Sequence, residues 1–296
     1  MRYKRIGLLC GVLLSPLHAQ ALTYVDTELQ LLMDVSGSVS ASEFNLQLQG
    51  YVDAFYSSDV QNAILDTSDG KSGSIAVQLI MWSGATQQSV MTDWFHLYDM
   101  TSINEFAATL DALVRPYSGM TAPGSAMAFG GLQFDTNDFT SARQVMDVSG
   151  DGMANAGLDT ATVRNQLLAS GIDTINGIAI GQDYAPGELQ QWYLDNIAGG
   201  QDAFVMNATT FADFGTALER KLSAEIQGGG DSGRGVGGPC RGSSPAGSAV
   251  VGAATADGLA LAGACHTDGS HGDWLKGVLR RGRKSPHLFP LSGLLL

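Results

Sequence analysis

Between residues 22 and 227 the chain has no cysteine and only one histidine, His96. A single histidine, with neither a cysteine nor a G-x-S-x-G loop, gives no support for a catalytic triad. We therefore expect His96 to be a surface or edge-strand residue. The lack of cysteine fits an oxidising compartment without proving one.

Positive charge is also scarce. Residues 22–230 carry 25 acidic and 6 basic residues, a net charge of −19. Nucleic acid is bound by basic surfaces, so this composition argues against nucleic acid as a partner. It also disfavours adsorption on anionic lipid. An acidic surface favours solubility and attracts cations.

Long apolar runs are missing as well. Residues 1–21 have a basic start, a short apolar core over residues 8–14 and the cleavage sequence Ala19-Gln20-Ala21. This pattern predicts a Sec-type signal peptide, and hence a secreted or periplasmic protein. An uncleaved anchor is the alternative, but the apolar core is too short to span a bilayer stably.

The composition changes abruptly at Gly228. Residues 228–296 are expected to form a glycine-rich linker and a disordered tail, which would be the only route to membrane contact or surface association. A C-terminal anchor and a reading-frame error are two further explanations. The tail holds Cys240 and Cys265, which either form a disulfide or remain unrelated thiols.

Residues 22–227 have the length of one domain, in which apolar and amphipathic segments alternate. The expected strands are Glu28–Met33, Ile75–Trp82, Ser89–Leu97 at an edge, Gln144–Val148, Ile172–Ile180 and Ala203–Met206. The expected helices start at the capping boxes Ser40/Glu43 and Ser102/Glu105, at Pro123 and at Thr210/Asp213, and cover Asp159–Ser170 and Glu188–Ile197. This alternation predicts an α/β fold: a doubly wound, mostly parallel central sheet flanked by helices, with one antiparallel edge strand.

The first strand ends in Asp34-x-Ser36-x-Ser38, which places one carboxylate and two hydroxyls on one tight loop. In doubly wound sheets, ligands bind beyond the carboxyl ends of the strands, where this loop is expected. These are hard oxygen donors that suit Mg²⁺ or a similar small cation, not zinc or copper. Alone the pattern is weak, since its residues are also common in turns.

Two further loops add donors at the same end of the sheet. Thr121 precedes the proline that starts a helix, and Asp151 follows the strand Gln144–Val148. The segment Asp147-x-Ser149-x-Asp151-Gly152 imitates half of a calcium hand, but Leu158 stands where that motif needs a glutamate, so we reject this interpretation.

With these three loops the chain resembles the von Willebrand factor A (vWA) family with a metal-ion-dependent adhesion site (MIDAS). It also resembles a group of secreted bacterial vWA-like domains of unknown function, through segments such as Trp82-Ser-Gly84 and Ile175-Asn-Gly177. Two residues depart from the family pattern. Met120 stands where a small residue is usual, and Gly150 where threonine is frequent.

The resemblance implies that Ser36, Ser38 and Thr121 ligate Mg²⁺ directly, with Mn²⁺ or Ca²⁺ as alternatives. Asp34 and Asp151 would bind the ion directly or hold its waters. It further implies a non-enzymatic module whose metal accepts an acidic side chain from a protein partner.

Two questions stay open: the role of Asp147 and the class of function. Asp147, on a buried strand, needs partners. It either supports the metal loop or caps a neighbouring turn. For the function, a metal-dependent hydrolase of phosphate esters and a structural component of a cell-envelope assembly are the alternatives to a binding module.

Overall fold

The structure is a computed structural model that describes residues 21–228. The expected signal peptide up to residue 20, and the linker and tail from residue 229 with both of its cysteines, lie outside the described residues. No helix of the described part is long and apolar enough to cross a bilayer.

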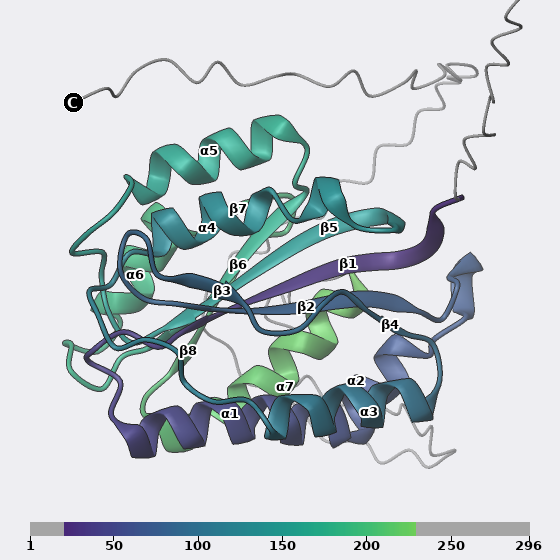
Figure 1. Cartoon of the computed structure of the whole chain (residues 1–296), viewed down its shortest axis with the longest axis horizontal. Helices are drawn as coiled ribbons and strands as arrows, with labels where there is room; N and C mark the ends of the chain where they lie inside the picture. The colour runs from purple at the N-terminus through teal and green to yellow at the C-terminus, as the bar shows by residue number, and fades with distance from the viewer. Residues whose placement is uncertain (1–20, 229–296) are drawn as a thin grey trace, which may run out of the picture. The chain divides into compact units, whose positions relative to one another are not determined.

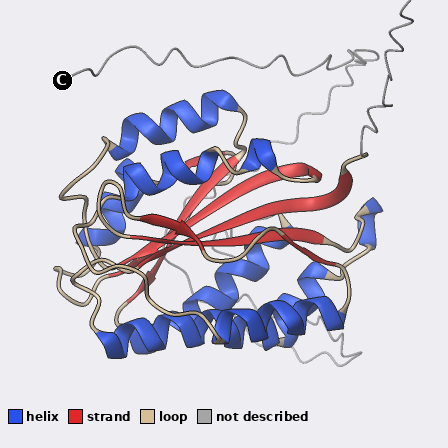
Figure 2. Cartoon of the chain, viewed as in Figure 1, coloured by secondary structure: helices blue, strands red, loops and turns tan. Residues whose placement is uncertain are grey.

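A single sheet forms the centre of the domain, with helices on both of its faces (Figures 1 and 2). The strands are β1 (Thr23–Asp34), β2 (Ile75–Trp82), β3 (Gln88–Val90), β4 (Phe95–Leu97), β5 (Phe139–Gly150), β6 (Thr174–Ile180), β7 (Gly199–Gly200) and β8 (Val205–Ala208). The helices are α1 (Ala41–Tyr56), α2 (Ser58–Ile64), α3 (Met100–Asp111), α4 (Pro123–Gly131), α5 (Thr160–Ser170), α6 (Glu188–Asn196) and α7 (Phe211–Gln227), with 3₁₀ turns at Ser68–Gly70 and Phe134–Thr136.

The strand order β3-β2-β1-β5-β6-β7 confirms the predicted doubly wound fold. The pairs β2–β1, β1–β5, β5–β6 and β6–β8 are parallel, whereas β3, β4 and β7 are antiparallel additions. β1 therefore lies in the middle, buried along most of its length on both faces. Its carboxyl end, at Asp34, and that of β5, at Gly150, meet at one edge of the sheet.

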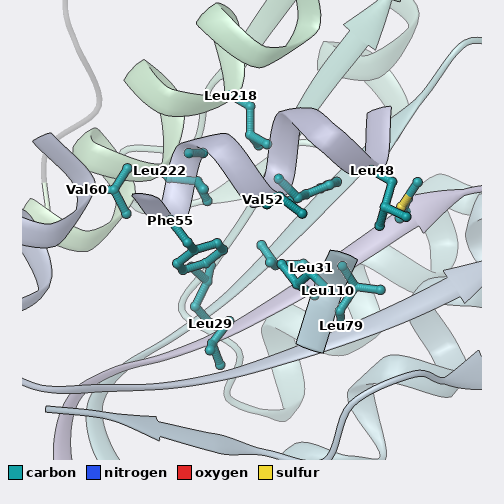
Figure 3. Close-up of a cluster of buried hydrophobic side chains, with 14 of the residues drawn as sticks. Leu29, Leu31, Leu48, Val52, Phe55, Val60, Leu79, Leu110, Leu218 and Leu222 are labelled. Atoms are coloured by element: carbon teal, nitrogen blue, oxygen red, sulfur yellow. The ribbon is translucent and has the colours of Figure 1, made fainter. Parts of the chain in front are cut away.

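Each face of the sheet has its own apolar core. Helices α1, α2, α3 and α7 cover one face, where residues such as Leu31, Phe55 and Leu222 pack together (Figure 3). Helices α4, α5 and α6 cover the other face, where Leu32, Trp82 and other buried side chains pack. Successive strand residues alternate between the two cores, because side chains of a strand point to opposite faces in turn.

The predicted capping boxes have different outcomes. Ser40 and Glu43 exchange hydrogen bonds at the start of α1, as predicted. The Ser102/Glu105 box was wrong: the cap of α3 is Asp99, whose carboxylate accepts from the backbone N–H of Ser102 at 2.7 Å. A carboxylate at this position suits the positive end of the helix dipole.

The predicted edge strand Ser89–Leu97 is two short strands, β3 and β4, both antiparallel to β2. Between them the hydroxyl of Thr92 accepts from the backbone N–H of Leu79 at 2.9 Å. A side chain thus takes the place of a backbone acceptor, and the ladder of hydrogen bonds is interrupted there. His96 lies on edge strand β4, as expected.

Candidate metal centre

The three predicted donor loops meet at the carboxyl ends of β1 and β5. Ser36 Oγ lies 3.2 Å from Ser38 Oγ and accepts a hydrogen bond from Thr121 Oγ1 at 3.2 Å. Ser38 Oγ donates to Asp151 Oδ1 at 2.7 Å. The backbone N–H of Ser36 donates to Asp34 Oδ1 at 2.7 Å. All five side chains predicted from the sequence are therefore linked in one cluster.

The cluster is buried but open on one side. Asp34 and Ser36 are fully buried, Thr121 and Asp151 are 4% exposed, and Ser38 is exposed. One oxygen of each carboxylate, Asp34 Oδ2 and Asp151 Oδ2, has no hydrogen-bond partner among the described residues. A buried carboxylate oxygen without a partner is costly, so both oxygens favour a positive group beside them.

The two carboxylates hold their protons unusually tightly. The pKa of Asp34 is raised from 3.8 to about 8, mainly by burial and also by the nearby charge of Asp151, although hydrogen bonds from Ser36 oppose this rise. Burial likewise raises the pKa of Asp151, while the hydrogen bond from Ser38 lowers it. A divalent cation would reverse this effect, since metal ions bind the ionised form of a carboxylate.

The pKa shifts predict that the metal-free domain becomes more stable as the pH falls from about 8 to about 5. A carboxyl group whose pKa rises on folding contributes stability that is complete below its unfolded pKa and is lost as the pH rises through its folded pKa. For Asp34 this window runs from 3.8 to about 8. Thermal unfolding in a chelator measures the trend, and saturating Mg²⁺ should flatten or reverse it. A melting temperature that rises with pH in the chelator contradicts these shifts.

Arg115, which the sequence analysis missed, joins the first two loops. Its guanidinium donates hydrogen bonds to the backbone carbonyls of Val35, Ser36, Val39 and Tyr117, at 2.6 to 2.9 Å for the shortest bond to each. Hydrogen bonds from a charged donor are stronger than neutral ones. The side chain therefore fixes the Asp34–Ser38 loop against the segment that leads to Thr121.

Two neutral side chains fix the remaining loops. Asn155 Oδ1 accepts from the backbone N–H of Thr121 at 2.8 Å, which ties the second loop to the third. Gln47, buried on α1, donates to the backbone carbonyl of Asp34 at 2.9 Å. No local pattern singled out these residues, because each acts through a contact distant in the sequence.

Asp147 does neither of the things expected of it. It points to the face of the sheet covered by α7, where Lys221 Nζ lies 2.5 Å from its Oδ1. Lys221 also pairs with Glu225 one turn later on the same helix. All three side chains are completely buried. This cluster binds α7 to β5 on the sheet face opposite Asp34.

The one histidine of the described residues, His96, does not lie at the centre. His96 pairs with Ala76 at the beginning of β2, whereas Asp34 pairs with Trp82 at its end. No group of three or more His, Cys, Asp and Glu side chains in the described part is placed to hold a metal ion. Hydroxyls provide three of the five candidate donors, and such oxygen donors favour a hard cation.

A groove of about 450 Å³ lies beside the third loop. It is lined by Ala154, Ala156, Gly157, Leu158, Asp159, Thr160, Trp192 and Asn196. None of the five candidate donors lines it, so the groove is separate from the cluster of donors.

The central sheet and the helices on both faces define a doubly wound α/β domain with the candidate loops at its strand ends. The chain belongs to the family described as Protein of unknown function (DUF1194), whose model matches residues 24–230. No curated protein matches the sequence.

Solved structures share the fold at low sequence identity. Proximal thread matrix protein 1 from the mussel byssus is 16% identical, with a TM-score of 0.50 over 68% of this chain and 48% of the mussel protein. A second structure of that protein, with a zinc-occupied MIDAS motif, is 17% identical, with a TM-score of 0.47 over 69% of this chain and 48% of the mussel protein. The chain thus spans about half the length of the mussel protein that it matches.

Two bacterial structures are similar to a comparable degree. The von Willebrand factor type A protein from Catenulispora acidiphila is 18% identical, with a TM-score of 0.47 over 69% of this chain and 43% of that protein. The pilus adhesin SpaC from Lactobacillus rhamnosus GG is 13% identical, with a TM-score of 0.49 over 69% of this chain and 31% of the adhesin. At such identities the likeness concerns the fold and not the function.

Proposed function

We propose that this chain is a secreted or periplasmic binding module that recognises a protein partner through a Mg²⁺-bridged carboxylate contact. One observation carries the proposal: the cluster of Asp34, Ser36, Ser38, Thr121 and Asp151 at the open end of the sheet. These five side chains would hold the ion, and Mn²⁺ or Ca²⁺ would be accepted by the same oxygens.

The donor set fits such an ion. Each hydroxyl of the cluster lies within 3.2 Å of another donor, and two carboxylate oxygens have no partner among the described residues. A bound cation would supply the positive charge that this buried group of oxygens lacks. It would act as a Lewis acid and accept an anionic oxygen from outside the chain.

The rim supports a protein ligand. Ser38 opens the centre to solvent, and Met120 and Leu158, on the loops beside it, are each 53% exposed. Apolar side chains around a charged contact are suited to a protein surface, which can bury them. Because the domain is strongly acidic, a partner carboxylate would bind here only with the cation in place.

Metal titration tests the centre. The full chain should bind Mg²⁺ in calorimetry, and Ser36→Ala should bind it at least about tenfold more weakly, since it loses a buried donor. Ser42→Ala is the matched control, because Ser42 is exposed near the same loop without belonging to the cluster. If Ser36→Ala binds Mg²⁺ as tightly as the unchanged chain, the ligand assignment is wrong.

Capture from the native envelope or medium tests the function. The immobilised chain should retain a protein in Mg²⁺ and release it in a chelator, and Asp34→Ala should retain none. If chelation lowers the melting temperature but leaves the capture unchanged, the metal has a structural role only. Turnover of generic phosphate esters that Asp151→Ala abolishes would instead favour a hydrolase.

A further inference from the structure

Tyr193, on α6, is a buried polar side chain beside the candidate centre. Its ring is completely buried in the core under α4, α5 and α6. Its hydroxyl has no hydrogen-bond partner among the described residues. Buried tyrosine hydroxyls normally have a partner, so this one requires an explanation.

Two glycines of the sheet make room for this side chain. A Cβ on Gly177, in β6, would stand 2.7 Å from the Cδ1 atom of Tyr193. A Cβ on Gly150, at the end of β5, would stand 2.8 Å from its hydroxyl oxygen. Gly177 pairs with Val148, two residues before Gly150, so both glycines lie on the same face of neighbouring strands. The ring therefore lies in a trough over Gly150 and Gly177, which a side chain on either glycine would fill.

The trough leads to a carboxylate of the candidate centre. The same Cβ on Gly150 would stand 2.7 Å from Asp34 Oδ2, which also has no partner among the described residues. The tyrosine hydroxyl and this oxygen thus flank one space above Gly150. A small shift of the phenol, or one water molecule, joins them by a hydrogen bond.

We propose that Tyr193 is a positioning residue of the metal centre, whose hydroxyl donates to Asp34 Oδ2 directly or through one water molecule when the cation is bound. The inference rests on the proposed metal site. Oδ1 of Asp34 already accepts from the backbone N–H of Ser36. A donor at Oδ2 fixes the rotation of the carboxylate and satisfies the oxygen that faces the core. Gly150 and Gly177 are then glycines because the ring needs their space.

The test is Tyr193→Phe in the full chain, titrated with Mg²⁺ by calorimetry. Removing the hydroxyl should weaken binding about tenfold, which is the lower end of the effect of losing a partner of a metal ligand. Mg²⁺ should also change the near-ultraviolet absorbance of the buried tyrosine in the unchanged chain, and this signal should be lost in Tyr193→Phe. The melting temperature in a chelator checks that the fold is intact.

Tyr51→Phe is the matched control. Tyr51 is equally buried, but its hydroxyl lies on the other face of the sheet, 3.0 Å from Ser149 Oγ. Its loss should leave Mg²⁺ affinity unchanged. Gly150→Ser should weaken binding, because its Cβ would stand 2.7 Å from Asp34 Oδ2 and 2.8 Å from the tyrosine hydroxyl.

The outcomes separate the two proposals. If the unchanged chain binds no divalent cation, the metal site itself fails, and this inference with it. If the unchanged chain binds Mg²⁺ and Tyr193→Phe binds it equally well, the positioning role alone is overturned. Equal weakening in Tyr193→Phe and Tyr51→Phe also overturns it, because the effect is then general to buried hydroxyls.

Discussion

Asp34→Asn is expected to stabilise the metal-free domain by a few kcal/mol while it removes metal binding. Asp34 is completely buried, and its pKa is raised from 3.8 to about 8. Near pH 7.5 the unfolded chain has released this proton and the folded domain has kept it. Each unit of pKa difference corresponds to about 1.4 kcal/mol, which sets a ceiling of about 5 kcal/mol. Asparagine keeps the Oδ1 acceptor for Ser36 without the charge.

Urea unfolding with and without Mg²⁺ measures both effects. In a chelator, Asp34→Asn should unfold at a higher urea concentration than the unchanged chain. In Mg²⁺ at about a hundred times its dissociation constant, the free energy of unfolding of the unchanged chain should rise by about 2.7 kcal/mol. That of Asp34→Asn should not change. Asp53→Asn, on the exposed side of α1, is the control. It should change neither the urea concentration of unfolding in the chelator nor the stabilisation by Mg²⁺. A destabilised Asp34→Asn in the chelator, or one that still responds to Mg²⁺, contradicts the assignment.

Local patterns predicted most of the fold. The apolar run Ile75–Trp82 is β2 with the expected bounds, and the Thr210/Asp213 capping box starts α7. β1 and β5 extend several residues beyond their predicted beginnings, because they pair with each other along that length. β7 was not predicted, since two glycines form a strand only beside β6.

The candidate centre was predictable to the extent that its parts are local. Asp34, Ser36 and Ser38 share one loop, and the structure brings Thr121 and Asp151 to it. The supporting residues were not predictable in this way. Arg115, Gln47 and Tyr193 reach the centre from a coil and two helices, through packing that no periodicity encodes. Asp147 was recognised as needing a partner, but its partner lies on the last helix.

That partner, Lys221, carries the other large expected effect: Lys221→Met should lower the free energy of unfolding by about 3–5 kcal/mol. Its ammonium group contacts both Asp147 and Glu225 where none of the three is exposed. Without it, two carboxylates remain buried with no positive partner. Asn176 still donates to Glu225 at 2.7 Å, which offsets only part of the loss.

Urea unfolding at constant pH measures this loss, with Lys71→Met as the matched control. Lys71 forms an ion pair with Asp66 at 2.9 Å, but both side chains are about 30% exposed. Such a pair contributes less than about 1 kcal/mol, so its loss should be small. If both substitutions lower the free energy of unfolding equally, burial is not the reason why the ion pairs of Lys221 stabilise the fold.

The loss in Lys221→Met should also depend on pH. Burial and the charge of Asp147 raise the pKa of Glu225 to about 7, although Lys221 opposes this rise. Without the lysine the pKa of Glu225 rises further. The stability that Glu225 contributes is then complete below its unfolded pKa of 4.5 and is lost over a wider pH range above that value. The deficit should therefore be largest near pH 8 and shrink towards pH 5. Replacing Asp147 and Glu225 by apolar residues in the same variant should remove the pH dependence and recover most of the stability, because no buried charge is then left without a partner.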